Sequence, residues 1–131
     1  MRTPALIVTA GVLLAGCGSN DALASYTDPG DGCRQAVSAI GYADDALLVL
    51  GQEEHQKFDP AVRSRLAAVE GTISLEVRDF PNRRILLQAL KVAELADRAY
   101  VSENPDDDQI QALREYRREA AQLVIDCAAV D

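Results

Sequence analysis

The stretch NPDDDQIQALREYRREAAQLVIDCAA, residues 104–129, decides the fold class. It opens with a helix-capping residue, Asn104, and a proline, and three aspartates follow that the positive end of a helix dipole favours. Apolar residues then recur at steps of three and four: Ile110, Leu113, Tyr116, Ala120, Leu123 and Cys127. This spacing predicts one amphipathic helix over 105–129 with a buried stripe.

Three further prolines mark the starts of three more helices. Pro29 and Pro60 each follow an aspartate that suits a helix cap, and Pro81 stands at the head of another apolar stretch. The predicted helices cover 31–54, 60–78 and 82–102. The predicted core face of 31–54 consists of Cys33, Val37, Ile40, Ala43, Leu47 and Leu50. That of 60–78 consists of Val62, Leu66, Val69 and Ile73. That of 82–102 consists of Leu86, Ala89, Leu90, Ala93, Ala96 and Tyr100.

One segment departs from this pattern. Residues 72–77 alternate polar and apolar side chains after Gly71, as a strand would. A lone strand would have no evident pairing partner, so we expect a helix there and keep the strand as the alternative. The whole pattern predicts an all-α domain over 29–131, an antiparallel up-down-up-down four-helix bundle, because short connections make successive helices antiparallel.

The N-terminus has the parts of an export signal. A short positive segment, 1–4, precedes ten apolar residues, 5–14, a length that suits a signal core and is too short to span a bilayer. We therefore expect residues 1–16 to be a cleaved signal peptide.

The exit from that signal, Leu14-Ala15-Gly16-Cys17, resembles the lipobox of bacterial lipoproteins. The resemblance covers about seventeen residues and implies that the Cys17 thiol carries a diacylglycerol after cleavage before Cys17, often with a further acyl chain such as palmitate on its amino group. Residues 17–28 are then a lipidated N-terminus and tether. The implied location is the cell envelope, on the outer side of the plasma membrane. If the cell is Gram-negative, Gly18, which is not an aspartate, permits transfer to the outer membrane.

Two cysteines remain, Cys33 and Cys127. Export places them in an oxidising compartment, where a pair of thiols normally forms a disulfide. In the predicted bundle the first helix starts and the fourth helix ends at the same end, so the two cysteines are expected to meet. Two buried free thiols or a redox pair are the alternatives, and the missing Cys-x-x-Cys spacing disfavours the redox pair.

The chain is acidic, with a formal net charge of −8, and removal of residues 1–16 takes away one basic residue and no acid. Such a charge disfavours nucleic acid as a partner and favours cationic proteins or peptides. It is also an ordinary means of staying soluble.

The sequence offers no assembled catalytic, cofactor or metal set. The one histidine, His55, lies in a polar stretch, and the run Asp106-Asp107-Asp108 lacks the alternating spacing of a calcium loop, so helix capping accounts for it. Asp44 borders the first helix's apolar face, where an arginine neighbour is expected.

Two groups of arginines stand out: Arg78, Arg83 and Arg84, and Arg114, Arg117 and Arg118. We expect them to pair with nearby acids, those of the second group with Glu115 and Glu119. Arg83 and Arg84 are also the candidate residues for binding a carboxylate or phosphate of a partner.

These patterns predict a membrane-anchored, non-enzymatic protein-interaction module that contacts the bilayer through Cys17 and binds another envelope protein. The alternatives are an acidic inhibitor or immunity protein for a cationic enzyme or toxin, and a small-ligand carrier with an apolar cavity between its helices. A dense acidic face would favour the inhibitor, whereas evenly spread charge would weaken it.

Overall fold

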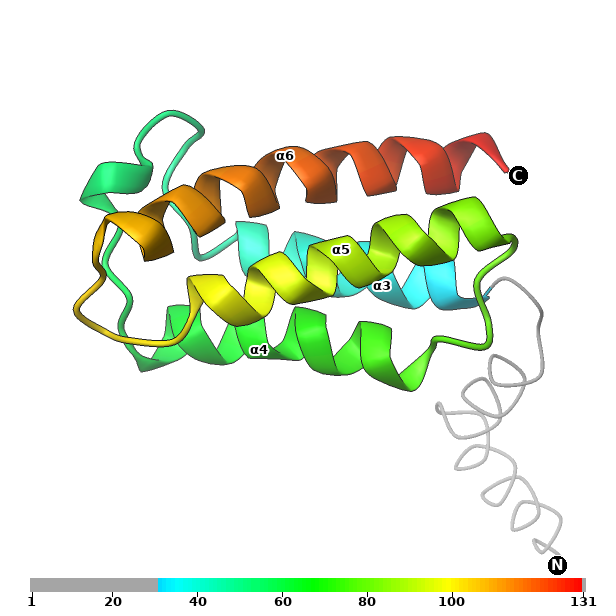
Figure 1. The fold of residues 1–131 in the computed structure, drawn as a ribbon, viewed down its shortest axis with the longest axis horizontal. Coiled ribbons are helices and arrows are strands. Elements are labelled where there is room, and N and C mark those ends of the chain that lie inside the picture. The colour runs from blue at the N-terminus through cyan, green and yellow to red at the C-terminus, as the bar shows by residue number, and fades with distance from the viewer. Residues whose placement is uncertain (1–30, 131) are drawn as a thin grey trace, which may run out of the picture.

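The computed structural model describes residues 31–130, and within that range helices are the only regular secondary structure (Figure 1). The helices are α3 (Asp31–Asp44), a short 3-10 helix η1 (Glu53–His55), α4 (Pro60–Leu75), α5 (Arg83–Ala99) and α6 (Asp107–Ala129). The prediction of four helices in an all-α bundle is confirmed. The predicted signal peptide, Cys17 and the tether lie outside the described residues.

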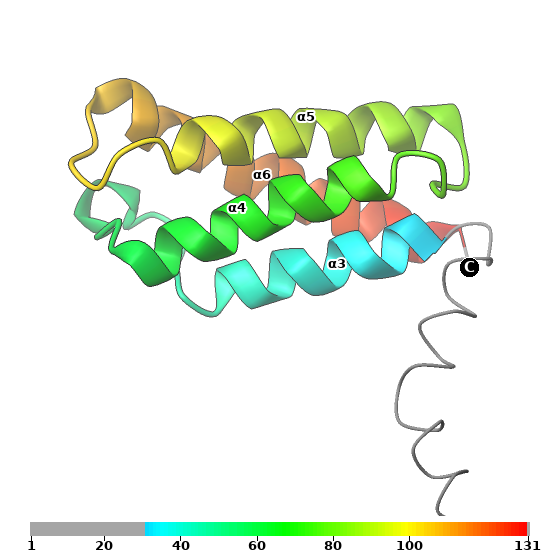
Figure 2. The same ribbon diagram turned by 90° about the horizontal axis from the view of Figure 1, so that it is seen from below.

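The four helices lie side by side along one long axis. Helix α5 packs against α4 and α6, and α3 packs against α4 and also contacts α6 (Figures 1 and 2). The connections 45–59 and 100–106 lie together at one end, which we call the loop end. The connection 76–82, the start of α3 and the end of α6 lie at the other, the disulfide end. Among residues 31–130, no helix is both long enough and apolar enough to cross a bilayer.

The first predicted helix is too long by ten residues. Helix α3 ends at Asp44, and the next two turns are closed by the tighter bonds Ala46 N–H to Ala43 O and Leu47 N–H to Asp44 O. Gly51 then adopts a φ of +94°, which a helix cannot accommodate. Predicted core residue Leu47 is half-buried against the core, whereas Leu50 is 70% exposed, so its assignment to the core is wrong.

Helix α4 is as predicted at its start and along its core face. Pro60 is the first helical residue, and the Asp59 carboxylate caps the helix by accepting from Val62 N–H at 2.9 Å. All four predicted core residues of this helix are buried. The segment 72–77 is helical through Leu75 rather than a strand, and α4 ends three residues before the predicted boundary.

Helices α5 and α6 each start two residues after their proline. The caps are Asn82, which accepts from Ile85 N–H at 2.9 Å, and Asp106, which accepts from Gln109 N–H at 2.8 Å. Asn104 is therefore not the cap of α6, while the capping interpretation of the aspartate run is confirmed for Asp106. The predicted stripe of α6 is buried apart from half-buried Ile110.

The predicted stripe of α5 is partly out of phase, and the helix ends at Ala99, three residues before the predicted boundary. Leu90 is 41% exposed and Leu86 half-buried. The difference is a shift of the buried face, because Ile85, Val92 and Leu95 are fully buried although they lie outside the predicted stripe. The buried residues of α5 are Ile85, Ala89, Val92, Ala93, Leu95, Ala96 and Ala99.

The Cys33–Cys127 disulfide is present, as predicted. It joins the first turn of α3 to the last turn of α6, with a Cα–Cα distance of 5.5 Å. Both residues are buried, at 8% and 4% exposed. The cross-link therefore fixes the two ends of the described chain to each other.

The connection between α4 and α5 lies directly on the start of α3. Gly32 N–H donates to Asp79 O at 3.0 Å, and a Cβ on Gly32 would come within 3.1 Å of that same carbonyl. The close approach of the two backbones therefore favours glycine at position 32, because any larger residue would push the Asp79 backbone away. The contact brings the buried carboxylates of Asp31 and Glu76 close to Asp79.

Glu76 is a buried acid of this group that forms no salt bridge within residues 31–130. Its Oε1 has no hydrogen-bond partner among the described residues; the same is true of Asp31 Oδ1, but that oxygen lies 2.7 Å from Arg34 in an ion pair. Burial, then the charges of Asp79 and Asp31, raise the pKa of Glu76 above its ordinary value. The folded state therefore binds the Glu76 proton more tightly than the unfolded state does.

We expect Glu76→Gln to stabilise the domain at pH 7, by about 1 kcal/mol or about 4–8 °C in Tm, because the variant removes a penalised charge. The penalty is absent below the ordinary glutamate pKa of 4.5 and grows as the pH rises through the raised pKa. The stability difference between variant and parent should therefore vanish in thermal melts below about pH 4.5. Glu94→Gln, at an exposed site 3.8 Å from Lys91, is the control and should change stability by less than about 0.5 kcal/mol. A less stable Glu76→Gln variant at pH 7 would contradict this account.

Candidate interaction surface

The first loop of the loop end, residues 45–59, is held in shape by a buried amide. Gln56 is 7% exposed; its Oε1 accepts from Leu48 N–H at 2.8 Å and its Nε2 donates to Lys57 O at 2.9 Å. Within the loop, Gln52 N–H donates to Val49 O at 3.1 Å, which closes a tight turn with Gly51 at its positive-φ position. The loop therefore has one defined backbone path.

Two arginines of α6 fix this loop to the bundle. The Arg117 guanidinium donates to Leu48 O, and Arg114 lies 3.9 Å from buried Glu53 and 3.6 Å from exposed Glu54 of η1. These contacts replace the predicted pairing of Arg114 and Arg117 with acids of their own helix. Partial burial raises the pKa of Asp44, and the neighbouring charge of Arg117 opposes that rise. The arginine neighbour expected for Asp44 is therefore Arg117.

A buried glutamine amide also holds the second loop, residues 100–106. Gln109 is 3% exposed, and its Nε2 donates to Ala99 O at 2.9 Å and to Ser102 O at 2.8 Å. Arg63 of α4 donates from Nε to Tyr100 O at 3.1 Å. Side chains of the helices thus hold the backbones of both loops by hydrogen bonds.

The tip of the first loop presents three consecutive apolar residues to solvent. Leu48, Val49 and Leu50 are 41%, 73% and 70% exposed. Single exposed apolar residues are ordinary, but a run of three on a fixed loop is typical of a surface that a partner covers. We call these three residues the apolar tip.

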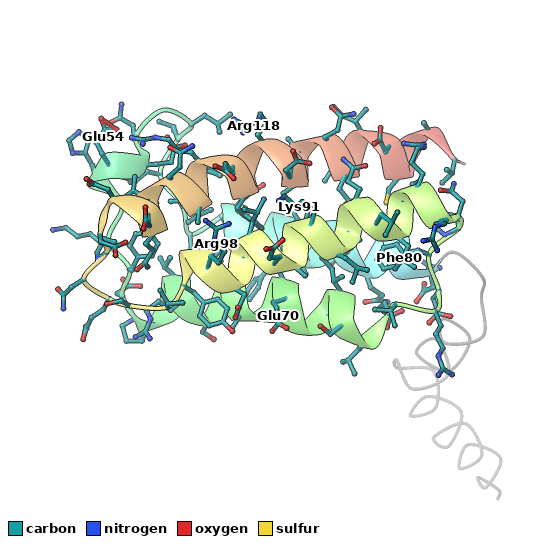
Figure 3. All side chains as sticks on the ribbon, viewed as in Figure 1. Glu54, Glu70, Phe80, Lys91, Arg98 and Arg118 are labelled. Carbon is teal, nitrogen blue, oxygen red and sulfur yellow. A yellow bond between two sulfur atoms is a disulfide. The ribbon has the colours of Figure 1, made fainter. Side chains whose placement is uncertain are left out.

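An open cavity of about 640 Å³ lies at the same end, where the two loops meet. His55 is one of its lining residues, and no three acidic, histidine or cysteine side chains within 31–130 converge to hold a metal ion. Figure 3 shows Glu54 on η1 at this end, with Phe80 at the opposite one. The lining residues are Glu54, His55, Gln56, Lys57, Phe58, Asp59, Glu103, Asn104 and Pro105.

The negative charge of the described domain is concentrated at the loop end. The connections 45–59 and 100–106 contain six Asp and Glu against one Lys. The rest of residues 31–130 contains twelve Asp and Glu against eleven Lys and Arg and is close to neutral. Folding thus gathers acids from two segments that lie far apart in the sequence.

The predicted partner-binding arginines lie elsewhere, at the disulfide end. Arg83 and Arg84 open α5, and both are exposed. Arg84 pairs with Asp126 of α6 at 3.3 Å. The structure does not bring these arginines near the apolar tip or the cavity, so the two candidate surfaces are separate.

The apolar tip was not predicted from the sequence, because the helix predicted over 31–54 placed Leu50 in its core. The available signal was Gly51 directly after five consecutive apolar residues, 46–50, because a glycine at that place favours a turn that ends the helix. Comparison of this chain with protein-family models, curated proteins and solved structures finds no match.

Proposed function

We propose that this chain is a bacterial lipoprotein anchored through Cys17, and that its helical domain binds another protein of the cell envelope by the loop end, without catalysis. We further infer that the four helices follow one another in the up-down-up-down order. In this arrangement the tether enters at the disulfide end, and the loop end faces away from the membrane.

The observation that carries the proposal is the fixed, exposed apolar tip. Gln56 and Arg117 hold the Leu48 backbone from two sides, so the loop is ordered before it meets a partner. Preorganisation of this kind lowers the entropic cost of binding, and apolar side chains at the centre of an interface supply much of its affinity.

An inhibitor or immunity protein for a cationic enzyme is the second candidate. It is favoured by the concentration of acids at the loop end, because a dense field of one sign speeds the approach of an oppositely charged protein. A ligand carrier would instead use an apolar cavity between the helices, whereas the cavity described here lies between polar loops.

Photo-crosslinking in living cells tests the proposal. A photoreactive residue at Val49 should form an adduct with one envelope protein, and the same residue at Leu87, which is 51% exposed on α5, should not. Arg117→Ala should weaken the Val49 adduct severalfold because the loop loses its clamp, and adjacent exposed Arg118→Ala should leave it unchanged. No Val49 adduct, or an equal one at Leu87, would reject binding by the loop end. Mass spectrometry of the same protein tests the lipid on Cys17 separately.

A further inference from the structure

The apolar tip and the cavity belong to the same loop of the loop end. The first loop carries the tip and then, after Gly51, continues into η1 and the residues that line the cavity. The short hydrogen-bonded turn from Val49 to Gln52 separates the two features by a few residues along the chain. The tip supplies apolar side chains and the cavity supplies charged ones.

Charge sets the kind of segment that fits. Glu54 and Asp59 line the cavity from the first loop and Glu103 lines it from the second, with Asp107 and Asp108 following on α6. All five are exposed. Lys57 is the exposed cation among the lining residues, and Arg114 is already close to two glutamates. An acidic segment would be repelled here, and an uncharged one would form no ion pair with the exposed carboxylates of Glu103, Asp107 and Asp108.

From these charges and the exposed apolar tip we propose that the loop end binds a cationic, amphipathic segment of a partner protein. Apolar side chains of that segment pack on Leu48, Val49 and Leu50, and its Lys or Arg side chains pair with Glu54 and Glu103 on the two sides of the cavity. The inference rests on the proposed function and adds the chemistry of the partner to it.

The charges of the rest of the domain do not compete with the loop end for a cationic segment. The twelve acidic and eleven basic residues outside the loop end nearly balance, and at physiological ionic strength charges are screened beyond about 8 Å. Helix α6, with 23 residues, is about 34 Å long, so the arginines of the disulfide end act independently of the loop end. Steering by charge is therefore local to the tip and the cavity.

The test uses the mature chain, residues 17–131, with Cys17→Ser and an intact disulfide, labelled for NMR. The probe is a twelve-residue peptide that repeats Lys-Leu-Leu-Lys, compared with one carrying Glu for Lys and one carrying Ser for Leu. We expect the first peptide alone to bind, to shift amide signals in 48–57 and 103–108, and to weaken at least tenfold between low and high salt.

Matched variants locate the contact. Glu54→Gln with Glu103→Gln should raise the Kd about fivefold, while Glu94→Gln with Glu119→Gln, an equal charge change on α5 and α6, should change it less than twofold. Leu50→Ala should raise the Kd about threefold, and Leu87→Ala, on exposed α5 surface, should not.

The inference is overturned by any of three results: no binding of the cationic peptide at millimolar concentration, shifts outside the loop end, or equal loss in the control variants. If one of these results is found while the Val49 adduct still forms in cells, the loop end binds a partner of other chemistry. Loss of the Val49 adduct itself would instead reject the proposed function.

Discussion

Removing the Cys33–Cys127 disulfide is expected to lower the free energy of unfolding by about 4–5 kcal/mol. The two cysteines are 94 residues apart, and closing a loop of that length restricts the unfolded chain strongly. Small domains are stable by only about 5–15 kcal/mol, so a large share of the total depends on this bond. The effect should appear in urea unfolding of Cys33→Ala with Cys127→Ala as a lower midpoint.

Reductant provides the internal control for this experiment. The parent protein in dithiothreitol should unfold like the double variant, and the double variant should not respond to dithiothreitol at all. A difference of less than about 1 kcal/mol between parent and variant would show that the packing of α3 on α4 and α6 holds the disulfide end without the cross-link.

Leu66→Ala is expected to cost about 2–5 kcal/mol, because it leaves a cavity in a closely packed core. Leu66 is 0% exposed on the middle of α4. Leu75→Ala is the matched control: it makes the same substitution in the same helix at a residue that is 83% exposed, and should change stability by less than about 0.5 kcal/mol. Comparable losses in the two variants would mean that α4 does not bury the face described here.

Helix content and two of the four core faces could be predicted from the sequence. In α4 and α6 the apolar residues at steps of three and four are the ones that the fold buries, while Leu75 of α4 and Ile125 of α6 lie off these stripes and are exposed. In α5 the alanines and leucines offer two overlapping stripes, and which one is buried depends on how closely the neighbouring helices approach. That distance is a property of the whole bundle, and the local pattern does not contain it.

The loop end could not be predicted for a similar reason. Its shape depends on contacts between residues far apart in the sequence: Leu48 with Arg117, and Glu54 with Arg114. The apolar periodicity of 31–50 fits one continuous helix as well as it fits the observed helix and loop. Nothing within that segment shows that side chains from elsewhere in the chain hold Leu48. The disulfide could be predicted, because Cys33 lies near the start of the first predicted helix and Cys127 near the end of the fourth. Both lie on predicted core faces.

The same cross-link determines what a protease can do to this domain. Any single cut in the connections 45–52, 76–82 or 100–106 lies between Cys33 and Cys127, so the two fragments stay covalently joined. The loops most open to cleavage therefore cannot release a piece of the bundle after one cut. If residue 17 carries the proposed lipid, a nicked domain also stays attached to its membrane, and only a second cut or reduction of the disulfide sets any part of it free.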